Sequence, residues 1–250
     1  MITLITPTGD RPEAFKLCEK YIARQTFRDF EWIVLDDSKN PMVCTQGQTH
    51  IHTPETRAQG SLVCKMRNIL QDKNARGIYR DPGDLIRGDT VVMIEDDDWY
   101  APNYLEKVVE RIGDADLYGE GRAMYYNVML RRWYPRANLD HCSLCATSFK
   151  RTVLPELYKQ LWTIDPYIDM RMWFKADQNL RRKVWDPTES GRTYVGIKGM
   201  PGRKGYSPAH HPRHTEVLNA TLDPNLEELH RLIGDDADAY APFYIPGNAR

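Results

Sequence analysis

The chain has 250 residues, a formal net charge of -1 at pH 7 and 28% charged residues. This length allows a sizeable core in one large domain, and the near-zero charge excludes a global field that attracts nucleic acid or acidic membranes. No apolar segment has membrane-spanning length and the N-terminus lacks a signal-peptide pattern, so we predict a cytoplasmic protein without integral membrane association.

Two apolar runs near the N-terminus are typical of buried parallel strands. Residues 2–6 form the first run, which ends in the turn sequence PTGDRP, and residues 32–35 form the second. Between them, residues 12–25 carry apolar side chains at helical spacing after a proline suited to a first turn. This order predicts a βαβ unit with parallel strands and a right-handed crossover.

The second run ends in two acids, and a third apolar run ends in four. Asp36 and Asp37 follow residues 32–35, and residues 91–94 lead directly into an acidic sequence. Its members are Glu95, Asp96, Asp97 and Asp98. Four carboxylates at one point oppose their own ionisation, which a divalent cation relieves, although an acidic run by itself is more often a solvated turn. Because ligands of open α/β sheets bind beyond the carboxyl ends of the strands, we expect both clusters to line one crevice.

The segments around the third run predict a loop and two helices. Residues 38–59 are polar and read as loop, with a short strand near 50–52, and residues 61–71 carry a helical apolar pattern. After the acids, a helix begins at Pro102 and ends at Gly113. Its inward face is predicted to carry Leu105, Val108, Val109 and Ile112.

Beyond residue 116 the sequence favours a mixed region over further crossovers. The segment YYNVMLRRWYP is aromatic, β-prone and suited to an antiparallel hairpin. We further expect a strand at 144–149, helices at 152–161, 166–180 and 226–233, and inward-facing Ile168, Met172 and Leu180.

Residues 181–214 are basic and rich in glycine. They contain eight Lys or Arg residues against two acids, together with five glycines. This combination favours close backbone approach to an anion and is hard to explain as core.

The cysteines argue for a reducing compartment. Their number is odd, at five, and most are scattered along the chain. Cys142 and Cys145 form a CxxC pair, but a structural zinc site normally has a second pair, so buried small side chains are the favoured interpretation.

Two common nucleotide-binding motifs are absent. A dinucleotide site has GxGxxG after the first strand, where this chain has PTGDRP, and a P-loop has GK followed by Ser or Thr. The remaining interpretation is a nucleotide held by carboxylates and by Mn²⁺ or Mg²⁺, the ions that oxygen ligands favour.

Four sequence motifs, in order, resemble the family 2 glycosyltransferases of the GT-A fold. They are TPTGDRPEAF, RQTFRDFEWIVLDDSKNP, CKMRNIL and VVMIEDDDWYAPNYLE, and the resemblance covers residues 2–112. It implies a Rossmann-like, mostly parallel central sheet flanked by helices, with a mixed acceptor-binding C-terminal half. It also implies a set of residues that hold the nucleotide: Thr6, Pro7, Arg11, Asp36, Asp37 and Arg67.

The resemblance assigns the acidic run to the metal-binding DxD motif of this family. Glu95 and Asp97 take the two motif positions, with Glu replacing the commonest first residue, and Asp98 lies beside them. We expect Asp97 to be the first metal ligand and Asp98 the second. The alternative role for Asp98 is to cap the helix that begins at Pro102. We count Asp96 among the donor-binding residues, and the alternative is that strand alternation points its carboxylate away from the site.

The second half resembles the family less closely. Inverting members use an acid on a helix to deprotonate the acceptor hydroxyl, which implies Asp169 as the general base. Asp165 directly precedes a proline and suits the N-cap of that helix. The alternative for Asp169 is an exposed acid that pairs with a nearby Lys or Arg. A late histidine often completes the metal site, which implies His210 or His211. The glycine-rich segment would cover the diphosphate, with Lys198, Arg203 or Lys204 offsetting its charge.

The resulting prediction is a metal-dependent inverting glycosyltransferase. It transfers a sugar from a nucleoside diphosphate sugar, a UDP-sugar by family prevalence, to a glycan or to a hydroxylated base in viral DNA. Residues 1–112 would bind the donor, 113–215 the acceptor, and 216–250 form a C-terminal helix and tail in one domain. The alternatives are a Mg²⁺-dependent nucleotidyltransferase and a non-enzymatic nucleic-acid-binding module built on residues 181–214.

Overall fold

The computed structural model describes residues 1–54, 85–160, 167–188, 191–205 and 207–246. The helix predicted at 61–71, with Arg67, lies outside the described residues, as does Asp165. No helix of the described part is long and apolar enough to cross a membrane.

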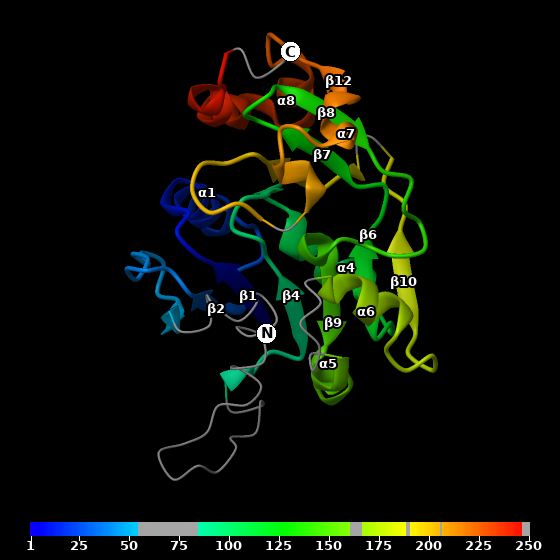
Figure 1. The fold of residues 1–250 in the computed structure, drawn as a ribbon. Coiled ribbons are helices and arrows are strands. Elements are labelled where there is room, and N and C mark those ends of the chain that lie inside the picture. Colours follow the sequence, from blue (N-terminus) through cyan, green and yellow to red (C-terminus); the bar gives the residue numbers. More distant parts are fainter. Residues whose placement is uncertain (55–84, 161–166, 189–190, 206, 247–250) are drawn as a thin grey trace.

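A seven-stranded sheet forms the larger layer (Figure 1). Its strands, in spatial order, are β10 (Arg182–Trp185), β6 (Leu117–Glu120), β9 (Thr147–Lys150), β4 (Thr90–Met93), β1 (Ile2–Thr8), β2 (Phe30–Asp36) and β3 (Thr49–His52). Neighbouring strands are parallel except at β9, which is antiparallel to both β4 and β6. Every residue of β1 and β4 is buried, as expected for strands covered on both faces. The α/β fold class and the βαβ unit, with α1 (Pro12–Ala23) as its helix, are confirmed.

A second sheet has five strands and mixed direction. Its order is β12 (Thr221–Leu222), β8 (Arg132–Pro135), β7 (Met124–Asn127), β11 (Tyr194–Lys198) and β5 (Trp99–Tyr100). The predicted hairpin is confirmed as the antiparallel pair β7 and β8, whereas β11 is parallel to β7 and antiparallel to β5. Figure 1 shows β7, β8 and β12 near the C-terminus, beyond one end of the larger sheet.

Helices cover the larger sheet and close the C-terminal end. Within the described residues, the α-helices after α1 are α4 (Tyr104–Ile112), α5 (Leu154–Gln160), α6 (Ile168–Phe174), α7 (Thr215–Leu218) and α8 (Glu227–Ile233). The same part of the chain contains the 3₁₀ segments η2 (Leu144–Ala146), η3 (Arg151–Val153), η5 (Pro208–His210) and η6 (Gly234–Phe243). Helix α4 packs against β6 and β9. The C-terminal η6 is fixed to α1 because the Tyr21 hydroxyl donates to the Tyr240 hydroxyl at 3.0 Å in the core.

Several predicted elements differ from the observed ones. The helix expected at 166–180 ends at Phe174, because the backbone N–H groups of Lys175 and Ala176 both donate to the Arg171 carbonyl and close its last turn. The strand expected at 144–149 begins only at Thr147, after η2. Val109 is not inward-facing, with 39% of its surface exposed, since the buried stripe of α4 follows Leu105, Val108 and Ile112.

The basic segment 181–214 is partly core, contrary to the sequence-based expectation. It contains β10 and β11, and all five residues of β11 are buried. Even Lys198 is only 3% exposed. A buried ammonium requires anionic partners, so its position depends on acids supplied from elsewhere in the chain.

The strand register gathers the predicted acidic ends. Thr8 of β1 pairs with Asp36 of β2, while Ile5 of β1 pairs with Met93 of β4. Because these strands are parallel, their carboxyl ends meet at one edge, and the acids that follow β2 and β4 lie on either side of the turn after β1.

Candidate active site

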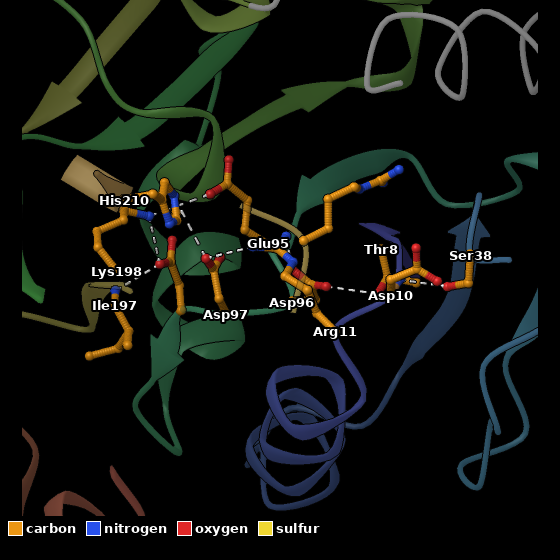
Figure 2. Close-up of polar contacts among 12 residues, drawn as sticks. Thr8, Asp10, Arg11, Ser38, Glu95, Asp96, Asp97, Ile197, Lys198 and His210 are labelled. Atoms are coloured by element: carbon orange, nitrogen blue, oxygen red, sulfur yellow. Dashed lines mark hydrogen bonds and ion pairs between the residues drawn. The ribbon is translucent and has the colours of Figure 1, made fainter. Parts of the chain in front are cut away.

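A cavity of about 830 Å³ lies at the edge where these strands end. Nine of the residues predicted for the site line it: Pro7, Arg11, Glu95, Asp97, Asp169, Lys198, Arg203, Lys204 and His210. They come from strand β1 and the turn after it, the acidic run after β4, helix α6, strand β11 and the segment after β11. The fold therefore brings residues from both halves of the chain to one concave site. Figure 2 shows part of this group.

Asp96 is fully buried and bound within the protein. One of its carboxylate oxygens accepts a hydrogen bond from the Thr8 hydroxyl at 2.7 Å, and the other is ion-paired with the Arg11 guanidinium (Figure 2). Arg11 occupies the N-cap position of α1, where the chain turns out of β1. Asp96 therefore ties β1 to the acidic run and is turned toward protein groups.

Asp98 is fixed by strand β11. Its Oδ1 accepts hydrogen bonds from the backbone N–H of Ile197 at 2.8 Å and from the Lys198 ammonium at 3.0 Å. Burial raises the pKa of Asp98 to about 6, with Asp97 adding to the rise and Lys198 opposing it. Its Oδ2 is buried and meets no hydrogen-bond partner at bonding distance among the described residues, while the nearby Cys145 thiol lowers the pKa of this carboxylate.

Asp97 lies at the cavity surface, between a guanidinium and an imidazole. Its Oδ2 accepts a hydrogen bond from Arg11 Nη1 at 2.8 Å and lies 3.8 Å from His210 Nε2 (Figure 2). Burial opposes ionisation of Asp97, but Arg11, Lys198 and His210 outweigh burial and lower its pKa to about 2. Burial lowers the pKa of His210 to about 3 despite the attraction of Asp97, so this imidazole is neutral and has a lone pair to offer.

Glu95 is the most exposed member of the acidic run and the least compensated. Burial, together with Asp98 and Asp97, raises its pKa to about 8 even though Lys198 Nζ lies 3.7 Å away. The acids raise the pKa of Lys198 well above its ordinary value against the opposing effect of burial, so it stays charged. With all four acids ionised, the cluster has four negative charges against the two positive charges of Arg11 and Lys198. This deficit equals the charge of one divalent cation.

The acid pair after β2 has a different environment. The Asp36 carboxylate is buried, accepts hydrogen bonds from the backbone N–H groups of Ser38 at 2.8 Å and Met42 at 2.7 Å, and lies 3.0 Å from His50 Nε2. Burial opposes its ionisation, but these partners lower its pKa. Asp36 does not line the cavity and holds the loop after β2 in place.

Asp37 is covered by the segment that follows β11. Its carboxylate forms a two-pronged ion pair with Arg203, including a 3.0 Å bond from Nη1 to Oδ2. Gly202 allows this approach because its φ is +100° and a Cβ there would lie 2.3 Å from the Asp10 carbonyl oxygen. Gly9 lies beneath the ion pair, where a Cβ would meet both charged groups.

The remaining predicted residues separate into two groups. Thr6 is buried and its hydroxyl accepts a hydrogen bond from Trp32 Nε1 at 2.9 Å, so it faces the core. His211 is exposed and absent from the cavity lining, whereas His210 faces Asp97. Asp169 lines the cavity from the first turn of α6, and burial raises its pKa.

Cys145 is a site residue that the sequence interpretation missed. Within the described ranges, one group of possible metal-ligating side chains has ligand atoms within 4.8 Å of one another, and it consists of Glu95, Asp98 and Cys145. Burial raises the pKa of the Cys145 thiol well above its ordinary value, so the thiol is protonated here. The CxxC spacing gave no signal for this, because Cys142 instead packs beneath Gly119.

Comparisons with known proteins identify the fold. No protein-family model matches the sequence, and no curated protein sequence matches it. Among solved structures, the mannosyltransferase PcManGT from Pyrobaculum calidifontis, in complex with GDP-Man and Mn²⁺, is similar with a TM-score of 0.52 and 15% identity. The similarity covers 98% of this chain and 70% of that one. The chain therefore has an α/β fold found in glycosyltransferases.

S. aureus TarS is similar at a lower level. It has 16% identity and a TM-score of 0.45 over 92% of this chain, which spans 41% of that TarS chain. A shorter TarS chain, residues 1–349 in complex with UDP-GlcNAc, has 15% identity and a TM-score of 0.45, with 97% of this chain and 71% of that chain covered.

Proposed function

We propose that this protein is a metal-dependent, inverting glycosyltransferase of the GT-A type, related to family 2. It would transfer a sugar from a nucleoside diphosphate sugar to an acceptor hydroxyl. The observation that carries the proposal is the cluster of four acids after β4, which when fully ionised exceeds its two cationic partners, Arg11 and Lys198, by two charges, in a fold shared with PcManGT. A nucleotide diphosphate adds further negative charge, so a divalent cation is needed to hold it at this edge.

The residues present fit such a cation. Asp97 and His210 are the ligands we assign first, because a carboxylate oxygen and a neutral imidazole nitrogen lie 3.8 Å apart at the cavity surface, too far for a hydrogen bond. Glu95 is the third candidate ligand, and the buried carboxylate of Asp98 adds negative charge beside the site. Mn²⁺ or Mg²⁺ bound there would stabilise the departing diphosphate.

The donor would lie between this cluster and the turn after β1. Arg11, Lys198 and Arg203 line the cavity and supply positive charge for the diphosphate. Pro7 borders the donor, while Thr6, Asp36 and Asp96 hold the strand ends that shape its site. Because Arg203 pairs with Asp37 in this structure, a uracil base would contact Asp37 only after Arg203 has left that carboxylate to bind a phosphate of the donor. We propose that Arg67 lies beside the base.

The acceptor would enter from the side of α6, with Asp169 as its general base. This carboxylate lines the cavity, and its raised pKa makes it a better proton acceptor than an exposed aspartate. Residues 1–112 would thus serve the donor and 113–215 the acceptor, with 216–250 closing the C-terminal end. A glycan or a hydroxylated DNA base is the proposed acceptor.

Two rival functions remain distinguishable. Nucleotidyl transfer uses the same acids and metal, but it releases pyrophosphate where glycosyl transfer releases a nucleoside diphosphate. A nucleic-acid-binding role for residues 181–214 is less favoured, because Lys198 and Arg203 of that segment pair with acids of this chain and Arg181 pairs with Asp114 and Asp116.

The test is a thermal-shift screen of nucleoside diphosphate sugars with and without Mn²⁺ or Mg²⁺, followed by product analysis for any donor that binds. We expect UDP-sugars to raise the melting temperature only with metal, and the reaction to release the nucleoside diphosphate. Metal-independent stabilisation, or pyrophosphate release, would contradict the proposal.

A further inference from the structure

The segment after β11 is docked on the turns that follow β1 and β2. The backbone N–H of Arg203 donates to the Asp10 carbonyl at 3.3 Å. Asp10 joins the two turns, because its N–H donates to the Ser38 hydroxyl at 2.8 Å (Figure 2) and its Oδ1 accepts a hydrogen bond from the Lys39 N–H at 3.0 Å. The Arg203 side chain is thereby held close to the carboxyl end of β2, although it lies 166 residues beyond Asp37 in the sequence.

The Arg203 guanidinium covers the Asp37 carboxylate. Two of its nitrogens form the two-pronged ion pair, and the carboxylate is fully buried. At Gly9 an added Cβ would collide with both charged groups, so this glycine leaves the room that the ion pair occupies. Arg203 lines the cavity whereas Asp37 does not. The ion pair therefore separates Asp37 from the cavity.

This ion pair lies at one end of the proposed donor site. Asp37 follows β2, and the acids proposed to hold the metal follow β4, on the other side of β1. Neighbouring strands lie about 4.8 Å apart, so these two strand ends are separated by about 10 Å. A nucleoside diphosphate whose phosphates lie beside the acids after β4 would extend its base toward β2, where Arg203 now lies.

Arg203 is also the cation most accessible to an incoming phosphate. Of the three cations assigned to the diphosphate, its side chain is the most exposed, at 26% against 15% for Arg11 and 4% for Lys198. A guanidinium binds a phosphate with the same two-pronged geometry that it uses for a carboxylate. A diphosphate has more charge and more oxygens than the single carboxylate of Asp37, so it can compete for this guanidinium.

We propose that Arg203 makes recognition of the base depend on the diphosphate, and this rests on the proposed function. Arg203 pairs with Asp37 until a diphosphate takes its guanidinium. The carboxylate then accepts a hydrogen bond from a ring N–H of the base, which uracil offers at N3 and guanine at N1. A nucleoside without phosphates has to break the ion pair unaided and binds weakly. Arg203 is thus a specificity-determining residue that favours nucleoside diphosphates over nucleosides.

The experiment measures whether inorganic pyrophosphate raises the affinity of the full-length protein for a nucleoside. Calorimetric titrations with uridine, and in parallel with guanosine, are made with Mg²⁺ in the presence and absence of pyrophosphate. We expect the Kd of one of these nucleosides to fall roughly tenfold when pyrophosphate is saturating. By linkage, the Kd of pyrophosphate should fall by the same factor when that nucleoside is saturating.

Variants at two neighbouring positions assign this coupling to Arg203. In Arg203→Gln the ion pair is absent, so the nucleoside alone should bind roughly tenfold more tightly than to the wild type, and pyrophosphate should raise its affinity no further. Arg203→Lys keeps the charge but loses the two-pronged geometry, and it should show the same change to a smaller extent. Lys204→Gln is the matched control, because it removes the next cation of the segment, which also lines the cavity. It should weaken pyrophosphate binding and leave the coupling intact.

Three outcomes would overturn the proposal. They are a nucleoside Kd that pyrophosphate leaves unchanged in the wild type, a coupling of the same size in folded Arg203→Gln or Arg203→Lys, and no binding of either nucleoside under any of these conditions. The proposal can fail separately from the proposed function. Sugar transfer by a protein without this coupling would keep the function and remove the role of Arg203. Coupling in a protein that transfers no sugar would keep that role and contradict the glycosyltransferase.

Discussion

The two acidic strand ends look alike in sequence and differ in how their charge is balanced. After β2, Asp36 accepts backbone hydrogen bonds and Asp37 is paired with Arg203, so both carboxylates have partners within the protein. After β4, the four acids share Arg11 and Lys198 and, when all four are ionised, remain two positive charges short. An acid at the end of a parallel strand is therefore structural or ligand-binding according to the cations that the rest of the chain brings to it.

The pKa values express the same contrast at Glu95 and Asp98, whereas Arg11, Lys198 and His210 lower the pKa of Asp97 to about 2. Hydrogen bonds lower the pKa of Asp36 although burial opposes them, whereas burial raises the pKa of Glu95 to about 8 and that of Asp98 to about 6. A lowered pKa means that the folded protein favours the carboxylate. A raised one means that ionisation is opposed until a cation arrives, which is the pattern expected of a ligand site.

Asp97→Asn is expected to have the largest effect on activity. The change keeps the shape of the side chain but removes the charge that faces His210 and the cavity. If a metal binds there, loss of several kcal/mol of transition-state stabilisation lowers kcat/KM roughly 100- to 1000-fold, and the metal-dependent thermal shift with donor disappears. Asp36→Asn is the matched control and should keep that shift. Equal losses in both variants would remove the distinction between the two strand ends.

Asp36→Asn should instead affect stability. The Asn amide cannot accept as two carboxylate oxygens do, so the N–H groups of Ser38 and Met42 lose a charged acceptor and the free energy of unfolding falls by about 1–3 kcal/mol. Because the folded-state pKa is lowered from 3.8, this contribution is present above pH 3.8 and is lost as the pH falls further. Urea unfolding of both proteins at pH 7 and pH 3 measures it. A difference that persists undiminished at acid pH would contradict this account.

The strand ends could be predicted from the sequence because they depend on local pattern. Apolar runs without polar alternation mark strands buried on both faces, and acids directly after them are at the carboxyl edge. Both features are visible within a dozen residues. The βαβ unit, the hairpin and the position of the acids after β4 follow from such patterns, whereas Arg11 and Asp169, which line the cavity, were implied by the family resemblance.

The charge balance could not be predicted, because it depends on pairs far apart in sequence. Asp98 meets Lys198 and Ile197 about a hundred residues later, and Asp37 meets Arg203 across an even longer separation. A basic, glycine-rich sequence is the same whether its charges face solvent or acids, so the burial of β11 left no signal. Cys145 is another case, since only the tertiary fold brings its thiol to Glu95 and Asp98.

The smallest expected effect is a pH dependence of metal affinity. Glu95 has a pKa of about 8 in the metal-free protein, so at pH 7 a divalent cation has to displace its proton. The apparent Kd for Mn²⁺ should therefore rise about tenfold per pH unit below pH 8, or about 1.4 kcal/mol, and level off above it. Below pH 6 the dependence should steepen, because Asp98 also binds a proton there.

Calorimetric titration in buffers of different ionisation enthalpy measures the proton release directly. Glu95→Gln should flatten the dependence between pH 6 and 8, whereas Glu31→Gln, which removes a carboxylate outside the cavity lining, should leave it unchanged. A pH-independent Kd in the wild type over that range would show that the acids after β4 are as fully balanced as those after β2.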